Sequence, residues 1–525
     1  MKVWTKVLIG LVIVSMLGLF GWKVAAPFIA KHVQKRMSDA KATKGKIIIA
    51  VDDWVGYFPL RSQRLKKEML NEGYLVECVP DNADYKARMK ALAEDSVNLA
   101  VCTVDAFVLN GAPEGYPGYI VSVIDESKGG DAIVAYADEI GSLDALRNNV
   151  TKKVAFTPDS PSHHLIKVAG VDFDIPLFRS KSSGLLIHSK DSADALGKLK
   201  RREVSVATLW QPQVSKALEI KGVVKLLGSE KTDHVIVDVL LANRQTMNSR
   251  PEIVSLLLQS YFRVLKHYLN EPKELERDIA AELKVDEVSA ASMVKGVSWV
   301  NLTDNARTWF GVAGTQVSGS RPERVLADTI DAAVSVLRQV GDFDRNPLPD
   351  SNPLMLTKSD FIADLYGTAV KSGFANVGGE ESKGLQGHSG TFNPLTDEQW
   401  SRMQDVGTLK VEPIKFQSGT DEITLEGKEA IDLIAGKMKR YPNFRIGVRG
   451  HSDVRGDQDA NKEISLARAQ SVARYLEVTH GIDAQRLRAE GLGGTKPLPR
   501  VPGESDRSYG YRLPRVEIVL LLDPF

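Results

Sequence analysis

Residues 450–456 read Gly-His-Ser-Asp-Val-Arg-Gly, and Asn461 and the run Ile-Ser-Leu-Ala-Arg-Ala at 464–469 follow them. The preceding segment RIGVR (445–449) predicts a strand that ends where the first glycine of this stretch begins. The loop after the strand should therefore present Asp453 at its tip. A strand, an acidic loop and a helix in this order decide the fold of the C-terminal part of the chain.

The helix after this loop has a plausible start. Ser465 is a favourable N-cap, so we expect a helix over 465–479 with Arg468 in its first turn. A positive charge in the first turn is unfavourable for the helix dipole. This small cost indicates that Arg468 is used for something other than helix stability.

The residues on either side of this stretch predict further elements of one small domain. Short apolar runs favour strands, and apolar residues at helical spacing favour a helix. We expect strands at 414–416, 488–491 and 516–521, and a helix at 424–439. With the elements above, they describe a compact α+β sandwich of helices on a small sheet.

The same stretch resembles the OmpA family of peptidoglycan-binding domains. The family pattern G-H-T-D-x-x-G-x-x-x-x-N-x-x-L-S-x-x-R-A is matched with Ser452 in place of threonine and Ile464 in place of leucine. Other positions of the family are also occupied, by Phe416, Gly419, Leu425, Pro442, Gly491, Gly493, Pro497, Arg515, Val516 and Glu517. The resemblance runs from roughly Leu409 to the end.

The resemblance implies a site for the stem peptide of peptidoglycan. In the family, the residues corresponding to Asp453 and Arg468 hold the diaminopimelate residue. Its side chain ends in an ammonium and a carboxylate on one carbon, so a carboxylate and a guanidinium can bind both groups together. Asn461 would add an amide contact or order the loop. The alternative is that Asp453 and Arg468 form only a structural salt bridge.

This chain departs from the family in two places. The family commonly has Asn-Arg-Arg before its last strand, whereas this chain has Leu-Pro-Arg at 513–515, so only Arg515 can take that role. The loop at 499–512 is also longer and richer in charge.

The central part of the chain alternates between two patterns. Short β-branched or apolar runs predict strands, and segments with helical spacing such as 59–72 and 84–95 lie between them. The strand-like runs are 46–51, 74–79, 97–102, 119–124, 153–156, 204–210 and 235–242. This alternation predicts βαβ units and a mostly parallel sheet, with ligands bound at the carboxyl ends of the strands.

The central part resembles periplasmic solute-binding proteins of the nitrate, sulfonate and taurine type, which deliver substrates to ABC transporters. The residues that carry this resemblance are VDDWVGYFPL (51–60), Val104-Asp105, DESKGGD (125–131), PDSPS (158–162) and LWQP (209–212). The resemblance implies an α/β fold of two lobes, about 45–125 with 237–345 and 126–236. In such sheets the second and third strands flank the first, which would hold Cys78 and Cys102 too far apart for a disulfide.

A cleft between these lobes would bind a small solute. The candidate residues are Asp53, Trp54, Tyr57, Asp105, Ser127, Lys128, Asp131, Ser160 and Trp210. The two tryptophans could sandwich an apolar group, whereas the hydroxyls and the lysine could donate to an anion. The acidic residues favour a cation equally, so the charge of the solute stays open. The alternative for Trp54 and Trp210 is core or hinge packing.

The N-terminus predicts a membrane anchor. Lys2 and Lys6 precede an apolar run at 7–22, which is shorter than the roughly 20 residues of a free-standing span, but 24–30 is apolar again. A cleaved signal peptide is the alternative, although Pro27 follows the small residues where cleavage would occur. We expect one transmembrane helix in the inner membrane of a bacterium, in contact with its lipid, and the bulk of the chain in the periplasm.

Composition bounds the remaining possibilities. A chain of 525 residues is too long for one core, and its 68 basic and 67 acidic residues give no charged face for nucleic acid. The sequence predicts an anchor (1–44), a solute-binding domain (45–371), a flexible Gly/Ser-rich linker (372–394) and the OmpA-like domain (395–525). With such a linker, the last domain could move independently of the first.

No pattern of residues compels catalysis, a metal site or a cofactor. His163-His164 reads as a solvated loop pair. We therefore expect a binding protein rather than an enzyme. Two alternatives stay open: a receptor that hands solute to a transporter or signalling partner while the wall domain serves only as a tether, and an envelope scaffold without a ligand.

Overall fold

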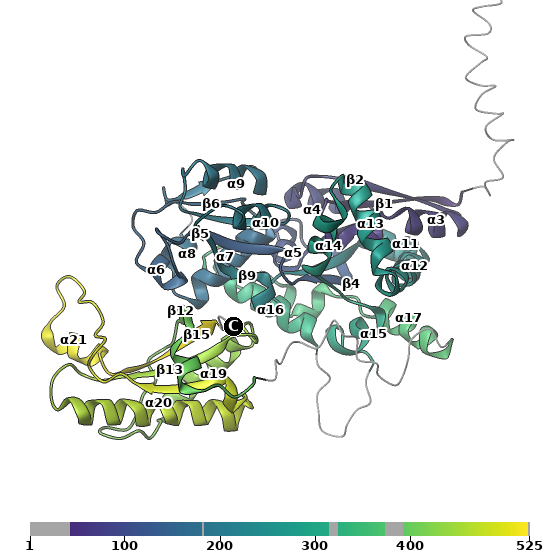
Figure 1. Ribbon diagram of the computed structural model, residues 1–525. Helices are drawn as coiled ribbons and strands as arrows, with labels where there is room; N and C mark the ends of the chain where they lie inside the picture. The colour runs from purple at the N-terminus through teal and green to yellow at the C-terminus, as the bar shows by residue number, and fades with distance from the viewer. Residues whose placement is uncertain (1–42, 181–182, 314–323, 373–391, 523–525) are drawn as a thin grey trace, which may run out of the picture.

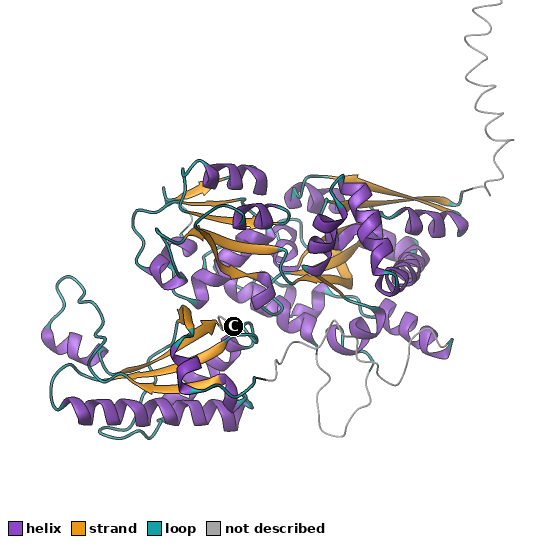
Figure 2. Cartoon of the chain, viewed as in Figure 1, coloured by secondary structure: helices purple, strands orange, loops and turns teal. Residues whose placement is uncertain are grey.

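A computed structural model describes residues 43–180, 183–313, 324–372 and 392–522. Within these residues, no helix is both long and apolar enough to cross a membrane. The expected anchor and most of the expected linker lie outside the described residues. The strands that are described form three sheets, one in each lobe of the central region and one in the C-terminal domain (Figures 1 and 2).

The first lobe is built on the sheet β11-β4-β10-β3-β1-β2. Its strands are β1 (Gly45–Val51), β2 (Tyr74–Pro80), β3 (Leu99–Thr103), β4 (Gly118–Ser127), β10 (Val237–Asn243) and β11 (Val297–Trp299). β2 and β3 flank β1 in parallel, as the resemblance implies. Both cysteines, Cys78 on β2 and Cys102 on β3, are free.

The expectation of a mostly parallel sheet is wrong for β10 and β11. β10 runs antiparallel to both β3 and β4, and β11 runs antiparallel to β4. The reason is the path of the chain. β4 leads out of this lobe toward the second lobe, and β10 returns beside it, so the two strands point in opposite directions.

The second lobe carries the sheet β7-β6-β8-β5-β9. Its strands are β5 (Asp131–Tyr136), β6 (Val154–Phe156), β7 (Leu186–His188), β8 (Val206–Trp210) and β9 (Val223–Gly228). β6 is parallel to β7 and β8, whereas β5 is antiparallel to β8 and β9. The predicted strands do not include β5, β7, β9 or β11.

Helices cover both sheets of the central region (Figure 2). Those of the first lobe are α2 (Phe58–Arg61), α3 (Gln63–Asn71), α4 (Tyr85–Ala93), α5 (Val104–Gly111), α11 (Arg244–Ser249), α12 (Pro251–Asn270), α13 (Pro272–Leu283), α14 (Glu287–Lys295), α15 (Leu302–Asp304), α16 (Val325–Gln339) and α17 (Asp360–Lys371). Those of the second lobe are α6 (Leu143–Arg147), α7 (Pro161–Asp172), α8 (Pro176–Arg179), α9 (Ser192–Lys200) and α10 (Gln213–Leu218). α16 contacts α5 of its own lobe and α7 of the other, so it bridges the two.

The C-terminal domain has the sheet β12-β15-β13-β14. Its elements are α18 (Asp397–Ser401), β12 (Gln404–Leu409), α19 (Leu425–Met438), β13 (Arg445–His451), α20 (Gln458–His480), β14 (Leu487–Gly491), α21 (Asp506–Arg512) and β15 (Arg515–Leu522). The predicted helix at 424–439 and the predicted strands at 445–449, 488–491 and 516–521 are confirmed. The predicted strand at 414–416 is wrong, because that segment forms only an isolated bridge between Phe416 and Ile423.

The predicted start of the next helix at Ser465 is also wrong. α20 begins at Gln458, where the Asp457 side chain accepts a hydrogen bond from the backbone N–H of Ala460 at 2.8 Å. Ser465 lies inside the helix, and its hydroxyl donates to the Lys462 carbonyl at 2.9 Å. Arg468 is therefore in the middle of α20, where the dipole argument for an unusual position does not apply.

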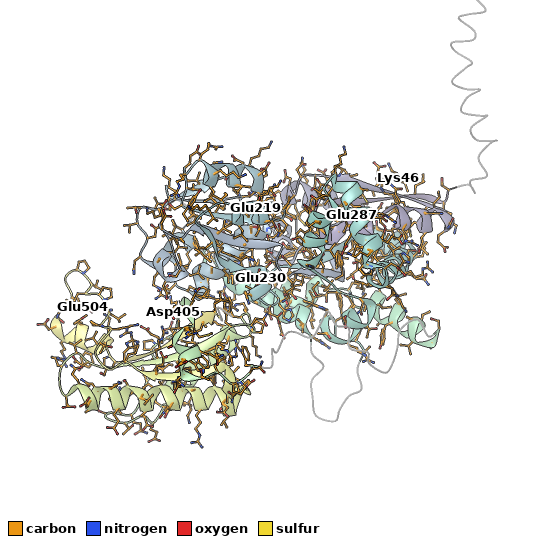
Figure 3. The ribbon with its side chains drawn as sticks, viewed as in Figure 1. Lys46, Glu219, Glu230, Glu287, Asp405 and Glu504 are labelled. Atoms are coloured by element: carbon orange, nitrogen blue, oxygen red, sulfur yellow. The ribbon has the colours of Figure 1, made fainter. Side chains whose placement is uncertain are left out.

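The C-terminal domain packs against the second lobe through β12 and the end of α19, and α20 lies on its far side (Figure 1). The Thr408 backbone N–H donates to Asp144 at 2.9 Å, and Arg147 donates to the Thr408 carbonyl at 2.7 Å. Gly407 permits this approach, because a Cβ there would lie 2.8 Å from the Phe173 ring. Glu230 and Asp405, labelled in Figure 3, lie near this contact.

A buried ion pair completes the contact. Asp172 is fully buried at the end of α7 and accepts hydrogen bonds from Arg440 at 2.9 Å and from the Tyr441 hydroxyl at 2.9 Å. Apolar side chains of the second lobe and the C-terminal domain form one continuous buried cluster. In this structure the domain is therefore docked on the second lobe.

Candidate functional site

The loop at 450–456 is held tightly between β13 and α20. A Cβ on Gly450 would lie 1.9 Å from the Ser465 backbone oxygen, so only glycine lets the strand lie this close to the helix. The Asn461 amide donates to the carbonyls of Asp453 at 3.1 Å and of Arg455 at 2.9 Å. The Asn461 side chain thus orders the loop, which is one of the two roles that the sequence predicts for it.

The Asp453 carboxylate lies at the surface and is bound by Arg455. Arg455 Nη2 donates to Oδ2 at 2.6 Å, Nε donates to Oδ1 at 3.1 Å, and the Arg455 backbone N–H donates to Oδ1 at 3.0 Å. Hydrogen bonds from the Arg455 side chain lower the pKa of Asp453, so the carboxylate is ionised at neutral pH. Sequence reasoning passed over Arg455, because the family pattern leaves its position unspecified.

Arg468 and Arg515 also have partners inside the domain. Arg468 Nε donates to the Thr420 carbonyl at 3.0 Å, and its guanidinium lies 5.1 Å from the centre of the Phe416 ring. Arg515 donates to Glu517 at 2.7 Å. Asp453 and Arg468 are thus each bound to other residues, and the alternative of a structural salt bridge between them is not realised here.

In the central region, two carboxylates face each other across neighbouring strands where the lobes meet. Asp125 on β4 is the direct register partner of Asp238 on β10, and both are buried. Trp54 Nε1 donates to Asp125 at 3.2 Å, and the Tyr57 hydroxyl donates to Asp238. A Cβ on Gly56 would lie 2.0 Å from Asp125 Oδ2, so glycine makes room for the carboxylate.

Burial of these carboxyl groups raises their pKa values. Desolvation raises the pKa of Asp125 to about 7, and it raises the pKa of Asp238 well above its usual range with a further contribution from the charge of Asp125. Desolvation also raises the pKa of Asp131 to about 6, although hydrogen bonds from Ser162 and Ser127 oppose the shift. Sequence reasoning missed Asp125 and Asp238 as site residues, because nothing local indicates that the two strands bring them together.

The structure brings four of the predicted solute-binding residues together and places the others around or away from them. Trp54, Tyr57, Ser127 and Asp131 come together where the lobes meet, since the Trp54 ring packs on Gly130 and Ser127 donates to Asp131 at 2.8 Å.

Lys128 adjoins them but is neutralised, because it donates to Glu126 at 2.8 Å and to Asp233. Asp53 is exposed at the start of the loop. Trp210 ends β8 as the register partner of Asp131.

Two further predicted residues have local roles. Ser160 caps α7, where its side chain accepts from the His163 backbone N–H at 3.1 Å. Asp105 on α5 is buried, and its Oδ2 lies 3.7 Å from Nδ1 of His164 on α7 of the other lobe. The prediction of His163-His164 as a solvated loop pair is wrong, because both lie on α7 and His164 is buried.

Glu126, Asp233 and His234 place three potential metal ligands within 4.8 Å of one another. Lys128 lies at the same cluster and donates to two of them. Its ammonium supplies the positive charge that a metal ion would otherwise bring. These residues and Lys128 form an ion-pair network.

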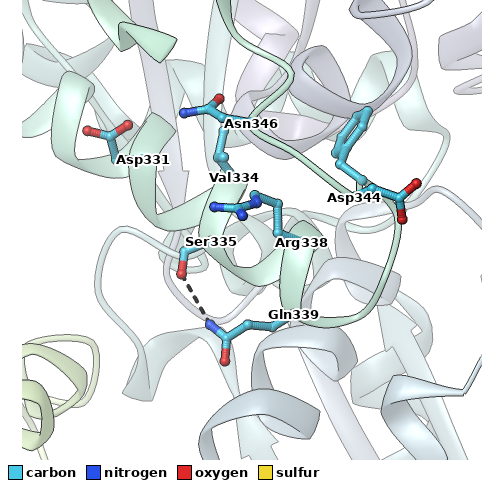
Figure 4. Close-up of a pocket in the computed structure, with 8 residues that line it drawn as sticks. Asp331, Val334, Ser335, Arg338, Gln339, Asp344 and Asn346 are labelled. Carbon is cyan, nitrogen blue, oxygen red and sulfur yellow. Dashed lines mark hydrogen bonds between the residues drawn. The ribbon is translucent and has the colours of Figure 1, made fainter.

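Two cavities stand out in the structure. The larger, of about 380 Å³, is an open groove beside α16 and is lined by Asp331, Val334, Ser335, Arg338, Gln339, Phe343, Asp344 and Asn346 (Figure 4). The smaller, of about 10 Å³, has room for about one water molecule. It lies where both lobes meet the C-terminal domain, and Asp105, His164, His234 and Arg440 are among its lining residues.

Comparison with known proteins places this loop in a matched family segment. Residues 415–509 match the model of the OmpA family. The C-terminal domain is an OmpA domain. The probable lipoprotein YiaD of Escherichia coli is 35% identical over 85 residues, which are 16% of this chain and only 38% of that protein. The peptidoglycan-associated lipoprotein of Rhizobium meliloti is 28% identical over 147 residues, which are 28% of this chain and 77% of that protein.

The central region consists of two lobes, each built on one sheet. It is similar to the periplasmic aliphatic sulphonate binding protein SsuA from Escherichia coli, with a TM-score of 0.43 and 17% identity over 57% of this chain and 93% of that one. It is also similar to the periplasmic nitrate-binding protein NrtA from Synechocystis PCC 6803, with a TM-score of 0.44 and 12% identity over 63% of this chain and 90% of that one.

Proposed function

We propose that this protein binds peptidoglycan through its OmpA domain and a small solute through its central region. The observation that carries the first part is the loop of Asp453. Its backbone is pinned by Asn461 and by the close contact of Gly450 with α20, while its carboxylate stays ionised at the surface. A charged group on a rigid loop is suited to selective binding, because little flexibility is lost when the ligand arrives.

The ligand we propose is the diaminopimelate residue of the stem peptide. Its ammonium would bind Asp453 and its carboxylate would bind Arg468 on α20. Arg468 is partly buried against Phe416 and has one hydrogen bond to a backbone carbonyl, which leaves other N–H groups of its guanidinium for a carboxylate. Arg515 is bound to Glu517, so we assign it a supporting role behind the loop.

Cosedimentation of the full-length protein with purified peptidoglycan tests this assignment. Asp453→Ala and Arg468→Ala should each weaken binding at least tenfold, because each removes one half of a charged recognition pair. Arg474→Ala is the matched control, since Arg474 is an exposed arginine elsewhere on α20. Unchanged binding by both site variants would overturn the site.

For the central region, we propose a solute that carries a positive charge or several hydrogen-bond donors. The hydroxyl and ammonium donors that would suit an anion are engaged: Ser127 by Asp131, and Lys128 by Glu126 and Asp233. Asp105, Asp125, Asp131 and Asp238 are instead buried carboxylates without a full positive charge bound to them. A cation or a hydrogen-bond donor can bind the oxygens of these carboxyl groups, whereas an anion brings only further acceptors to a desolvated place, which is unfavourable.

Calorimetry of the full-length protein with cationic, neutral and anionic small molecules tests the class of solute. We expect heat of binding with an ammonium compound and none with a sulfonate or nitrate. Asp125→Asn should weaken that binding, and Asp364→Asn, an exposed carboxylate on α17, should not. Binding of the anions alone would overturn the proposal, and no heat with any class would favour the ligand-free scaffold.

We further propose that the protein acts by binding rather than catalysis, and that residues 1–44 hold it in the inner membrane with the remainder in the periplasm. The apolar run at 7–22 supports the anchor. Membrane fractionation after an alkaline wash tests it, because a spanning segment stays with the lipid and a cleaved leader does not. A receptor that passes solute to a transporter, with the OmpA domain as tether, is compatible with the same layout.

A further inference from the structure

Arg455 stands where the proposed ligand would place its ammonium. It is bound to both carboxylate oxygens of Asp453 and lies two residues away on the same loop. We propose that Arg455 is a specificity-determining residue, which makes the Asp453 site select ligand ends that carry both an ammonium and a free carboxylate. This inference rests on the proposed binding of diaminopimelate.

The pair of Arg455 with Asp453 is easily exchanged. The Arg455 side chain is 73% exposed and that of Asp453 is 26% exposed, so water solvates the guanidinium even while it is paired. An ion pair at such a surface shifts an equilibrium by at most about fivefold. A ligand ammonium can therefore displace the guanidinium without a large loss of affinity.

The loop keeps its shape during this exchange. The Asn461 amide holds the carbonyls on both sides of the turn, and the Arg455 backbone N–H donates to Asp453 at 3.0 Å. None of these contacts involves the Arg455 guanidinium. The side chain can turn away while the carboxylate stays in place.

The displaced guanidinium then needs a new partner. The negative charge of the neighbouring Asp506 also stabilises the Arg455 guanidinium, but Asp506 is already paired with Arg500 at 2.7 Å. The ligand carboxylate lies on the same carbon as the ammonium. It can accept from the Arg455 guanidinium as well as from Arg468, because a carboxylate has about four lone-pair sites, and this completes the exchange of ion pairs. A ligand whose carboxylate is amidated displaces Arg455 from Asp453 but offers the guanidinium no new carboxylate. Its binding therefore lacks the contribution of one exposed ion pair.

The helical insertion of this chain lies against the same pair. A Cβ on Gly510 of α21 would be 2.9 Å from Arg455 Nη2 and 3.6 Å from Asp453 Oδ2. Glu504, labelled in Figure 3, marks this insertion at the outer edge of the domain. The insertion therefore limits the positions that the guanidinium can take.

The test compares two ligands and two proteins. The probes are a soluble stem peptide with a free diaminopimelate carboxylate and the same peptide with that carboxylate amidated, each titrated into the full-length protein. The wild type should prefer the free form. Arg455→Gln should reduce this preference about fivefold, mainly because the amidated peptide binds more tightly. Arg474→Gln, the matched control, should leave the preference unchanged.

Three outcomes separate the possibilities. A preference in Arg455→Gln within 1.5-fold of the wild type overturns the role of Arg455, provided that Asp453→Ala abolishes binding. Undiminished binding of both peptides by Asp453→Ala instead overturns the proposed site itself, and the role of Arg455 with it. Gly510→Ala moves the guanidinium without removing its charge, so it should also lower the preference, and an increased preference counts against the inference.

Discussion

At the scale of single residues, two buried carboxyl groups of the central region favour their protonated form where the lobes meet. Asp125 and Asp238 lie directly opposite each other on antiparallel strands, a position where like charges repel. Both are fully buried, and Trp54 and Tyr57 supply their hydrogen bonds. A neutral, protonated carboxyl is therefore the form that the folded state prefers.

The stability of this region should fall as the pH rises from about 4 to about 7. The folded pKa of Asp125, about 7, is above the value of 3.8 expected for the unfolded chain. In this window the folded state binds more protons than the unfolded state, so raising the pH destabilises it. Asp131, with a pKa of about 6, contributes in the same direction.

Asp125→Asn isolates this effect, because an amide is neutral at every pH. We expect the variant to gain on the order of 2–4 kcal/mol of unfolding free energy relative to the wild type at pH 8 and to show a flatter pH dependence. Urea unfolding between pH 4.5 and pH 8 measures both, with the exposed Asp364→Asn as control. A variant that keeps the wild-type slope would contradict the prediction.

At the scale of elements, β13 and α20 of the OmpA domain touch backbone to backbone. Gly450 lies against the Ser465 carbonyl, and Gly491 on β14 lies against Leu466. Side chains at these positions would push the helix off the sheet. The loop that carries Asp453 starts at this contact, so the packing of the helix also sets the position of the carboxylate.

Gly450→Ala should destabilise the OmpA domain by about 1–3 kcal/mol, because a Cβ 1.9 Å from a backbone oxygen forces the strand or the helix to move. Gly436→Ala on α19 is the matched control, since a Cβ there meets nothing within 4 Å. That change should stabilise the helix by about 0.5–1 kcal/mol. Hydrogen exchange of peptides covering β13 and α19 separates the two, and equal effects would contradict the argument.

At the scale of the whole molecule, the OmpA domain is clamped to the second lobe. The clamp is the buried Asp172 with Arg440 and Tyr441, and the Arg440 carbonyl accepts from the Asp233 backbone N–H at 2.8 Å. Asp233 lies on the segment that returns from the second lobe to the first. The OmpA domain thus contacts the segment that joins the two lobes, so its docking and the relative orientation of the lobes are physically linked.

Arg440→Ala should release the OmpA domain. Removing one partner of a buried ion pair typically costs about 3–5 kcal/mol, because Asp172 would stay buried without compensation. We expect a larger radius of gyration in X-ray scattering and faster hydrogen exchange in α6 and β12. Lys439→Ala, at an exposed neighbouring position, should change neither. Scattering identical to the wild type would mean that other contacts suffice for docking.

Residue patterns along the chain determined the local features of this protein. The loop with Asp453, the helix after Thr424 and the individual strands β1, β2 and β3 follow from periodicity, capping and motif spacing, which depend on near neighbours. Only the tertiary structure decided that β10 returns antiparallel and that Asp125 lies opposite Asp238. It also decided that Arg455 binds Asp453 and that Asp172 binds Arg440. Each of these depends on the path of the chain or on the direction in which a side chain turns. Interactions between distant segments set those features, and no pattern of near neighbours in the sequence records them.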